Sequence, residues 1–131
     1  MLDLIIKNGV CYIDGKPTKT NIGIQNGKIS TIGDLSDEQS REIIDATNLL
    51  VLPGCMDTQV HFREPGSTNA EDLHTGGKAA IAGGITSVFE MPNTNPPTAN
   101  MKEFNNKLSL AKNRMYSNCL LYTSPSPRDG W

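Results

Sequence analysis

The chain has 131 residues, of which 37% are hydrophobic and 20% charged, a balance typical of a globular domain rather than a disordered segment. Its formal net charge of -2 gives no electrostatic support for binding nucleic acid. The first fifteen residues contain charges and an Asn-Gly pair, so they do not read as a secretory signal. The three cysteines have no CxxC spacing, which favours reduced thiols. We therefore expect a cytoplasmic protein that does not associate with a membrane.

Residues 1–52 contain short β-prone runs separated by turn residues. The pair Asn26-Gly27 lies between alternating isoleucines, which is a strong hairpin signal, and Asp14-Gly15 marks an earlier turn. We therefore expect residues 1–52 to form a small antiparallel β-domain.

From residue 53 onward the pattern changes to strands that alternate with helices. The segment CMDTQVHF, residues 55–62, reads as a strand. Thr68 and Glu71 have the spacing of a capping box, and Gly83-Gly84 is a helix stop, so we expect a helix between them. This predicts the first strand and helix of a parallel α/β region.

A second strand and helix follow, with ITSVFEMPN, residues 85–93, as the buried strand. Asn100 and Glu103 have capping spacing for the helix. The apolar residues predicted to share one face of this helix are Met101, Phe104, Leu108 and Ala111. We expect residues 53–118 to contain two such strand-helix units.

Polar residues follow the ends of both predicted strands. On a strand, residues two apart face the same way, so Gln59, His61 and Arg63 should project together, and Asn93 ends the next strand. In parallel α/β folds, binding residues gather at these carboxyl ends.

Three further polar residues have simpler interpretations. Glu64 and Glu90 are acid/base candidates, but we interpret them as an exposed loop carboxylate and a structural residue at a strand end. His74 lies within the predicted helix and is expected to be exposed.

The stretch CLLYTSPSPRD, from Cys119 to Asp129, has neither helical nor strand periodicity. The same peptide resembles the translation of a transposon-end sequencing adapter. We therefore expect residues 119–131 to be a non-native tail, and the natural sequence to continue differently after Asn118.

Two segments together resemble a known family. The segments LPGCMDTQVHFREPG and GGKAAIAGGITSVFEMPNTNPPT are similar to the opening of dihydroorotases in the amidohydrolase superfamily, whose sequences read Asp-x-His-x-His-x-Arg-Glu-Pro-Gly and later Met-Pro-Asn-Thr. The resemblance runs from Leu2 to about Met115. It implies a small β-domain followed by a (β/α)8 metal-dependent hydrolase barrel, truncated here to its first two β/α units.

The resemblance also implies roles for individual residues. His61 matches a zinc ligand of the family, and Gln59 stands at the position of the family's first His ligand. The resemblance therefore implies a centre of one or two zinc ions. Gln59 puts the second zinc ion in doubt, because an amide is a poorer zinc ligand than imidazole. Arg63 and Asn93 match the residues that hold the substrate carboxylate. Asp57 is a carboxylate that can orient a metal ligand without binding the metal itself. The general base and remaining ligands are expected in sequence that is not present, so we expect the chain alone to be inactive.

Gln59 leaves three interpretations open. It can mark a natural subgroup with an altered metal centre, which we favour, or a catalytically silent relative that supports aspartate transcarbamoylase. It can also be a sequencing error, because His and Gln codons can differ by one base.

The implied reaction is hydrolysis of a cyclic amide, interconverting dihydroorotate and carbamoyl aspartate in pyrimidine biosynthesis. Another cyclic amidase, an allantoinase or hydantoinase, is the alternative, although Arg63 beside Asn93 argues against hydantoinase because hydantoins need carry no ring carboxylate. The substrate would be a small molecule, and we expect a homo-oligomer at full length.

Overall fold

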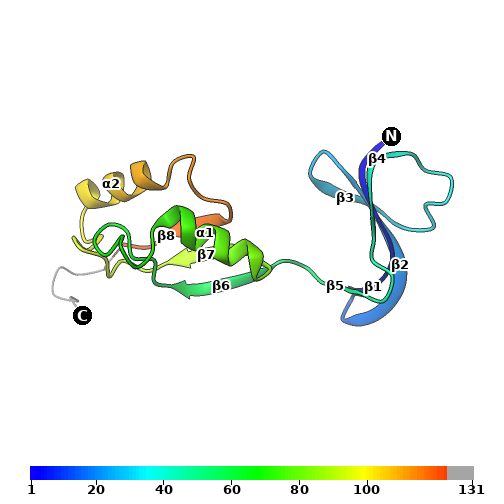
Figure 1. The fold of residues 1–131 in the computed structure, drawn as a ribbon, viewed down its shortest axis with the longest axis horizontal. Coiled ribbons are helices and arrows are strands. Elements are labelled where there is room, and N and C mark those ends of the chain that lie inside the picture. The colour runs from blue at the N-terminus through cyan, green and yellow to red at the C-terminus, as the bar shows by residue number, and fades with distance from the viewer. Residues whose placement is uncertain (124–131) are drawn as a thin grey trace. The chain divides into compact units, whose positions relative to one another are not determined.

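The structure, a computed structural model, describes residues 1–123. The chain divides into two compact units, Met1–Pro53 and a second that begins at Gly54 (Figure 1). Each unit has its own β-sheet.

The first unit is built around one five-stranded sheet. Its strands are β1 (Leu2–Ile13), β2 (Lys16–Gln25), β3 (Lys28–Gly33), β4 (Ser40–Asp45) and β5 (Leu50–Val51). The order is β3-β2-β1-β4, and β5 also pairs with β1. Leu2, Ile5 and Leu35 form its buried hydrophobic cluster.

Both predicted turns of the first unit are confirmed. Asp14 and Gly15 join β1 to β2 with φ of 49° and 75°, and Asn26 and Gly27 join β2 to β3 with φ of 53° and 71°. Two successive positive φ angles are typical of the type I′ turn, whose twist matches that of the paired strands. These short turns give the antiparallel pairs β1-β2 and β2-β3.

The rest of this sheet differs from the prediction of a purely antiparallel domain. β4 runs parallel to β1, with Ile5 opposite Ile43, and β5 also runs parallel to β1. The sheet is therefore mixed. Residues 34–39, rather than a two-residue turn, join β3 to β4, so no hairpin fixes the direction of β4.

The second unit alternates strands and helices. Its elements are β6 (Cys55–Val60), α1 (Leu73–Ala82), β7 (Ile85–Glu90), α2 (Met101–Ala111) and β8 (Asn118–Leu121). The three strands form a parallel sheet in the order β6-β7-β8, as expected for α/β architecture (Figure 1). Phe62, Leu73 and Val88 are at the centre of its core. None of the helices found between residues 1 and 123 has the length and apolar character needed to cross a bilayer.

Helix α1 starts later than predicted. Asp72 is its N-cap: the Asp72 carboxylate accepts a bond from the Thr75 N–H at 2.7 Å, and the Thr75 hydroxyl accepts one from the Asp72 N–H at 3.1 Å. The capping box expected at Thr68 and Glu71 is therefore wrong. The predicted stop is confirmed, since the helix ends at Ala82 with Gly83 as its C-cap.

Helix α2 starts as predicted, with the Asn100 side chain accepting a bond from the Glu103 N–H at 3.0 Å. The apolar residues predicted to share one face are unevenly covered: Phe104 and Ala111 are half-buried, whereas Met101 is 68% exposed and Leu108 is 52% exposed. The fully buried residue of this helix is Lys107.

Regular structure continues past Asn118. Strand β8 continues to Leu121, with its Cys119 opposite Val88 of β7. The expectation that no strand follows Asn118 is therefore wrong for residues 119–121. The Ser-Pro-Ser-Pro run, residues 124–127, lies outside the described residues. The non-native origin of residues 119–131 stays a prediction.

Candidate functional site

The loops that follow β6 and β7 lie side by side at the carboxyl ends of these parallel strands. The Met91 N–H donates to the Val60 carbonyl at 2.8 Å, and the Asn95 N–H donates to the Pro65 carbonyl at 3.0 Å. Gly66 has φ of +123°, and a Cβ at this position would lie only 3.0 Å from the Asn95 Cβ. The close approach of the two loops therefore requires glycine here.

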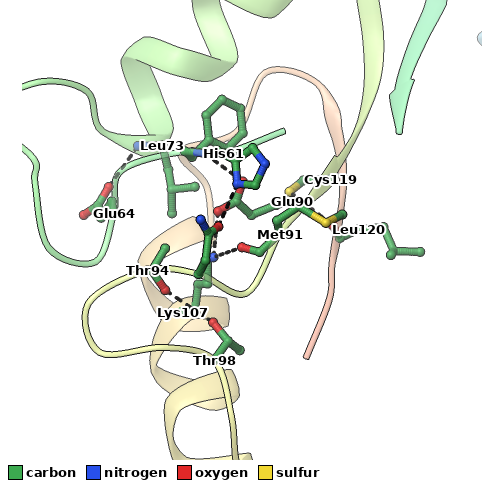
Figure 2. A network of polar contacts seen from close by, with 12 residues as sticks. His61, Glu64, Leu73, Glu90, Met91, Thr94, Thr98, Lys107, Cys119 and Leu120 are labelled. Atoms are coloured by element: carbon green, nitrogen blue, oxygen red, sulfur yellow. Dashed lines mark hydrogen bonds and ion pairs between the residues drawn. The ribbon is translucent and has the colours of Figure 1, made fainter. Parts of the chain in front are cut away.

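These loops bring together two of the predicted site residues. His61 Nδ1 lies 2.7 Å from Asn93 Oδ1, and the His61 side chain is exposed (Figure 2). Because an amide oxygen only accepts, Nδ1 must carry the proton in this arrangement. The lone pair of the ring is then on Nε2, which makes no hydrogen bond within residues 1–123.

Gln59, His61 and Arg63 are all exposed, whereas Val60 is half-buried and Phe62 is buried. These residues follow the predicted period, but Thr58, which the same period turns away from Gln59, is exposed too, and regular pairing of β6 ends at Val60.

Asp57 lies further back on β6, where its carboxylate accepts a bond from the Gln59 backbone N–H at 3.0 Å. The contact is local to one strand. Asp57 therefore orients the backbone of Gln59 in this structure.

Behind the exposed residues lies a buried ion pair that the sequence did not indicate. Lys107 Nζ is 2.7 Å from Glu90 Oε1, and both side chains are fully buried. Burial raises the pKa of the Glu90 carboxyl, while bonds from Lys107 and from the Phe62 N–H oppose the shift. Glu90 lies at the end of β7, as predicted, and its carboxylate is held in this buried pair.

Glu64, expected to be exposed, is buried. Its carboxylate accepts bonds from the Leu73 N–H and from Arg114 Nη1, both at 2.9 Å. Burial alone would raise the pKa of Glu64, but these bonds and the Arg114 charge outweigh it and hold the pKa below its ordinary value. A carboxylate held in this way is a poor proton donor.

His74 is also less exposed than predicted. It is half-buried, with its ring packed edge-on against Tyr116 at 5.2 Å between centroids. Cys119 is not a nucleophile candidate, because burial raises its pKa to about 11 and keeps the thiol protonated.

The donor chemistry of His61 fits a zinc ligand. Metal-binding imidazoles usually donate their second N–H to a carbonyl or carboxylate, as Nδ1 does to Asn93. Within residues 1–123, however, no three His, Cys, Asp or Glu side chains are grouped so as to hold a metal ion. The described residues can thus supply part of a metal site.

Comparison with known proteins agrees with this architecture. A sequence model of the Amidohydrolase family matches residues 50–121, more than half of the chain. A dihydroorotase of Methanosarcina acetivorans is 45% identical over 115 residues, which are 87% of this chain and 25% of that protein. An allantoinase of Salmonella choleraesuis is 40% identical over 114 residues, 86% of this chain and 25% of that protein.

The fold has solved counterparts as well. The structure of L-hydantoinase from Arthrobacter aurescens matches with a TM-score of 0.86 and 33% identity, over 97% of this chain and 29% of that one. The chain thus spans about a quarter of the length of the curated relatives it matches. On the sequence match and the shared fold, the chain belongs to the Amidohydrolase family.

Proposed function

We propose that the whole protein is a dihydroorotase-like hydrolase of cyclic amides, which interconverts dihydroorotate and carbamoyl aspartate in cytoplasmic pyrimidine biosynthesis. The observation that supports this most is the contact of His61 with Asn93 at the carboxyl ends of β6 and β7, with Arg63 exposed two residues beyond His61. The dihydroorotases among the relatives, up to 46% identical, point to the same reaction.

The proposed setting for this site is a (β/α)8 barrel. In this proposal β6 and α1, then β7 and α2, are its first two β/α units, within residues 53–118, and residues 1–52 are a separate β-domain. Active sites of such barrels lie at the carboxyl ends of the strands, where His61 and Asn93 meet.

Arg63 and Asn93 are proposed to bind the ring carboxylate of the substrate. A guanidinium presents a planar pair of donors that fits a carboxylate. Asn93 turns its amide oxygen toward His61, so its Nδ2 group is left to donate to an anion. One Asn side chain can therefore orient His61 and contact the substrate together.

His61 Nε2 is proposed to ligate zinc. Asp57 is proposed to support the site indirectly, by accepting a hydrogen bond from the Gln59 backbone N–H. When bound, zinc would polarise the amide carbonyl and lower the pKa of water, which supplies the nucleophile for ring opening. Further ligands and the general base are proposed to come from outside residues 1–123. Gln59 is a weaker ligand than histidine, so we propose an altered centre that holds one zinc ion more firmly than a second.

Two alternatives have specific support. The allantoinase and hydantoinase relatives favour another cyclic amide as the substrate. Gln59 favours a catalytically silent protein that assists aspartate transcarbamoylase. The presence of Arg63 and Asn93 in the loops that follow β6 and β7 is the reason for preferring a substrate that carries a carboxylate.

A substrate panel tests the proposal. The product of the complete open reading frame at the source locus, here called the whole protein, would be assayed with dihydroorotate, allantoin and hydantoin. We expect turnover of dihydroorotate. Turnover of only allantoin or hydantoin would contradict the substrate assignment. No turnover, together with co-purification of aspartate transcarbamoylase, would support the silent protein.

A further inference from the structure

Glu90, the last residue of β7, contacts two different parts of the second unit (Figure 2). One carboxylate oxygen, Oε1, is 2.7 Å from Lys107 Nζ on α2. The other, Oε2, accepts a bond from the Phe62 N–H at 2.9 Å. Lys107 Nζ also donates to the Met91 carbonyl at 3.1 Å.

We propose that Glu90 is a positioning residue for His61, acting through the Phe62 N–H. That N–H belongs to the peptide group that joins His61 to Phe62, so holding it fixes the backbone from which the imidazole projects. The inference rests on the proposed role of His61 as a zinc ligand.

The same ion pair also holds the loop that contains Asn93. Lys107 binds the Met91 carbonyl, two residues before Asn93, and the Met91 N–H bonds to Val60, just before His61. Both members of the His61–Asn93 contact are therefore anchored to one buried pair.

Packing alone does not account for a charged pair at this place. Two well-packed apolar side chains often stabilise a core as much as a buried ion pair, because burying charges removes their hydration. A carboxylate gives what an apolar side chain cannot, an acceptor for the Phe62 N–H. This N–H lies beyond Val60, where β6 ends, and Glu90 is its acceptor within residues 1–123.

Two double variants of the whole protein separate positioning from packing. Glu90→Gln with Lys107→Met removes both charges but keeps an acceptor for Phe62. Glu90→Met with Lys107→Met removes both charges and the acceptor. Three quantities would be measured: the His61 tautomer by 15N NMR of the metal-free protein, the affinity for Zn²⁺ by chelator competition, and the unfolding temperature.

The Gln double variant should keep the Nδ1-protonated tautomer and wild-type affinity for Zn²⁺. The Met double variant should populate both tautomers and bind Zn²⁺ roughly 10–100-fold more weakly, the usual effect of losing a group that orients a ligand. Its unfolding temperature should be only modestly lower than that of the Gln variant, because the buried Phe62 N–H alone loses its acceptor between the two. Glu90 has no positioning role if the Met variant keeps the tautomer and affinity, or if the Gln variant loses them equally.

A matched pair of amides gives a test that needs no variant. The Phe62 N–H bonds to Glu90 and the Leu73 N–H bonds to Glu64, both at 2.9 Å. Adding Zn²⁺ to the wild-type protein should shift the Phe62 amide resonance more than that of Leu73, and an equal or smaller shift would overturn the inference. If wild type binds no Zn²⁺, the proposed function fails, and the metal-free tautomers still decide the role of Glu90.

Discussion

Arg63 differs in its surroundings from Arg41 and Arg114, the other two arginines within residues 1–123. Arg41 pairs with Asp3 at 3.5 Å, and Arg114 pairs with Glu64 at 2.9 Å. Within residues 1–123, Arg63 takes part in no ion pair and is exposed beside the His61 loop. An exposed guanidinium that is not neutralised nearby is well suited to binding an anionic substrate.

Arg63→Ala in the whole protein should raise KM for dihydroorotate by about 10- to 150-fold, because a charge-assisted hydrogen bond contributes about 1.5–3 kcal/mol. Zinc content should not change. Steady-state kinetics with metal analysis measure both, and Arg41→Ala is the matched control on an exposed arginine of the first unit. An unchanged KM would show that Arg63 does not bind the substrate.

Gln59→His should increase the zinc content of the whole protein, since imidazole is a better zinc ligand than an amide oxygen. The side chain is exposed next to His61, so the larger ring should be accommodated. Zinc per protein would be measured by elemental analysis after dialysis. If the content stays at the wild-type value, position 59 is not at the metal centre.

At the level of single residues, the sequence predicted the grouping of exposed polar side chains but not the buried charges. Alternation in this segment was sufficient to predict that Gln59 and His61 are exposed while Phe62 is buried. The burial of Lys107 depends on Glu90, 17 positions away, and helical periodicity contains no information about that contact.

The start of α1 shows why a helix cap can be misread from sequence. Thr68-x-x-Glu71 and Asp72-x-x-Thr75 both resemble capping boxes. The structure uses the second because the buried Glu64 carboxylate binds the Leu73 N–H in the first turn. That contact joins residues nine apart through a loop, so local spacing could not select between the two templates.

Glu64→Gln should lower the free energy of unfolding by about 1.5–3 kcal/mol at pH 7, since it removes a charged partner of Arg114. The folded-state pKa of Glu64 is lowered, so its stabilisation is complete above the ordinary glutamate pKa of about 4.3 and is lost as the pH falls through the folded-state value. The difference between variant and wild type should therefore shrink in acid.

Urea unfolding of the whole protein at a series of pH values measures this difference. Glu42→Gln, on the exposed strand β4, is the control and should change stability little at any pH. A difference for Glu64→Gln that stays constant from neutral to acidic pH would mean that the Arg114 pair does not stabilise the fold.

At the scale of the whole molecule, the sequence predicted the alternation of strands and helices after residue 53 and both hairpins before it. It did not predict that β4 and β5 run parallel to β1, or that β8 pairs with β7. Turn residues determine the direction of strands joined by two residues. Strands that are not joined by such a turn pair through tertiary contacts, which local patterns do not record.

The origin of residues 119–131 can be decided at the source locus. Amplifying and sequencing genomic DNA across the codon for Asn118 should show a reading frame that differs from the Ser-Pro-Ser-Pro codons. The reason is that the peptide from Cys119 to Asp129 resembles a translated sequencing adapter. Finding those codons in genomic DNA would show that residues 119–131 are native and would contradict this prediction.

The central claim is that His61 binds the metal of a dihydroorotate-hydrolysing protein, and His61→Ala tests it most directly. Zinc content and dihydroorotate turnover would be measured together on the whole protein, wild type and variant. We predict that both fall in His61→Ala, because the ligand that Asn93 orients is lost. Wild-type turnover with unchanged zinc in His61→Ala would contradict the account and make His61 a structural residue.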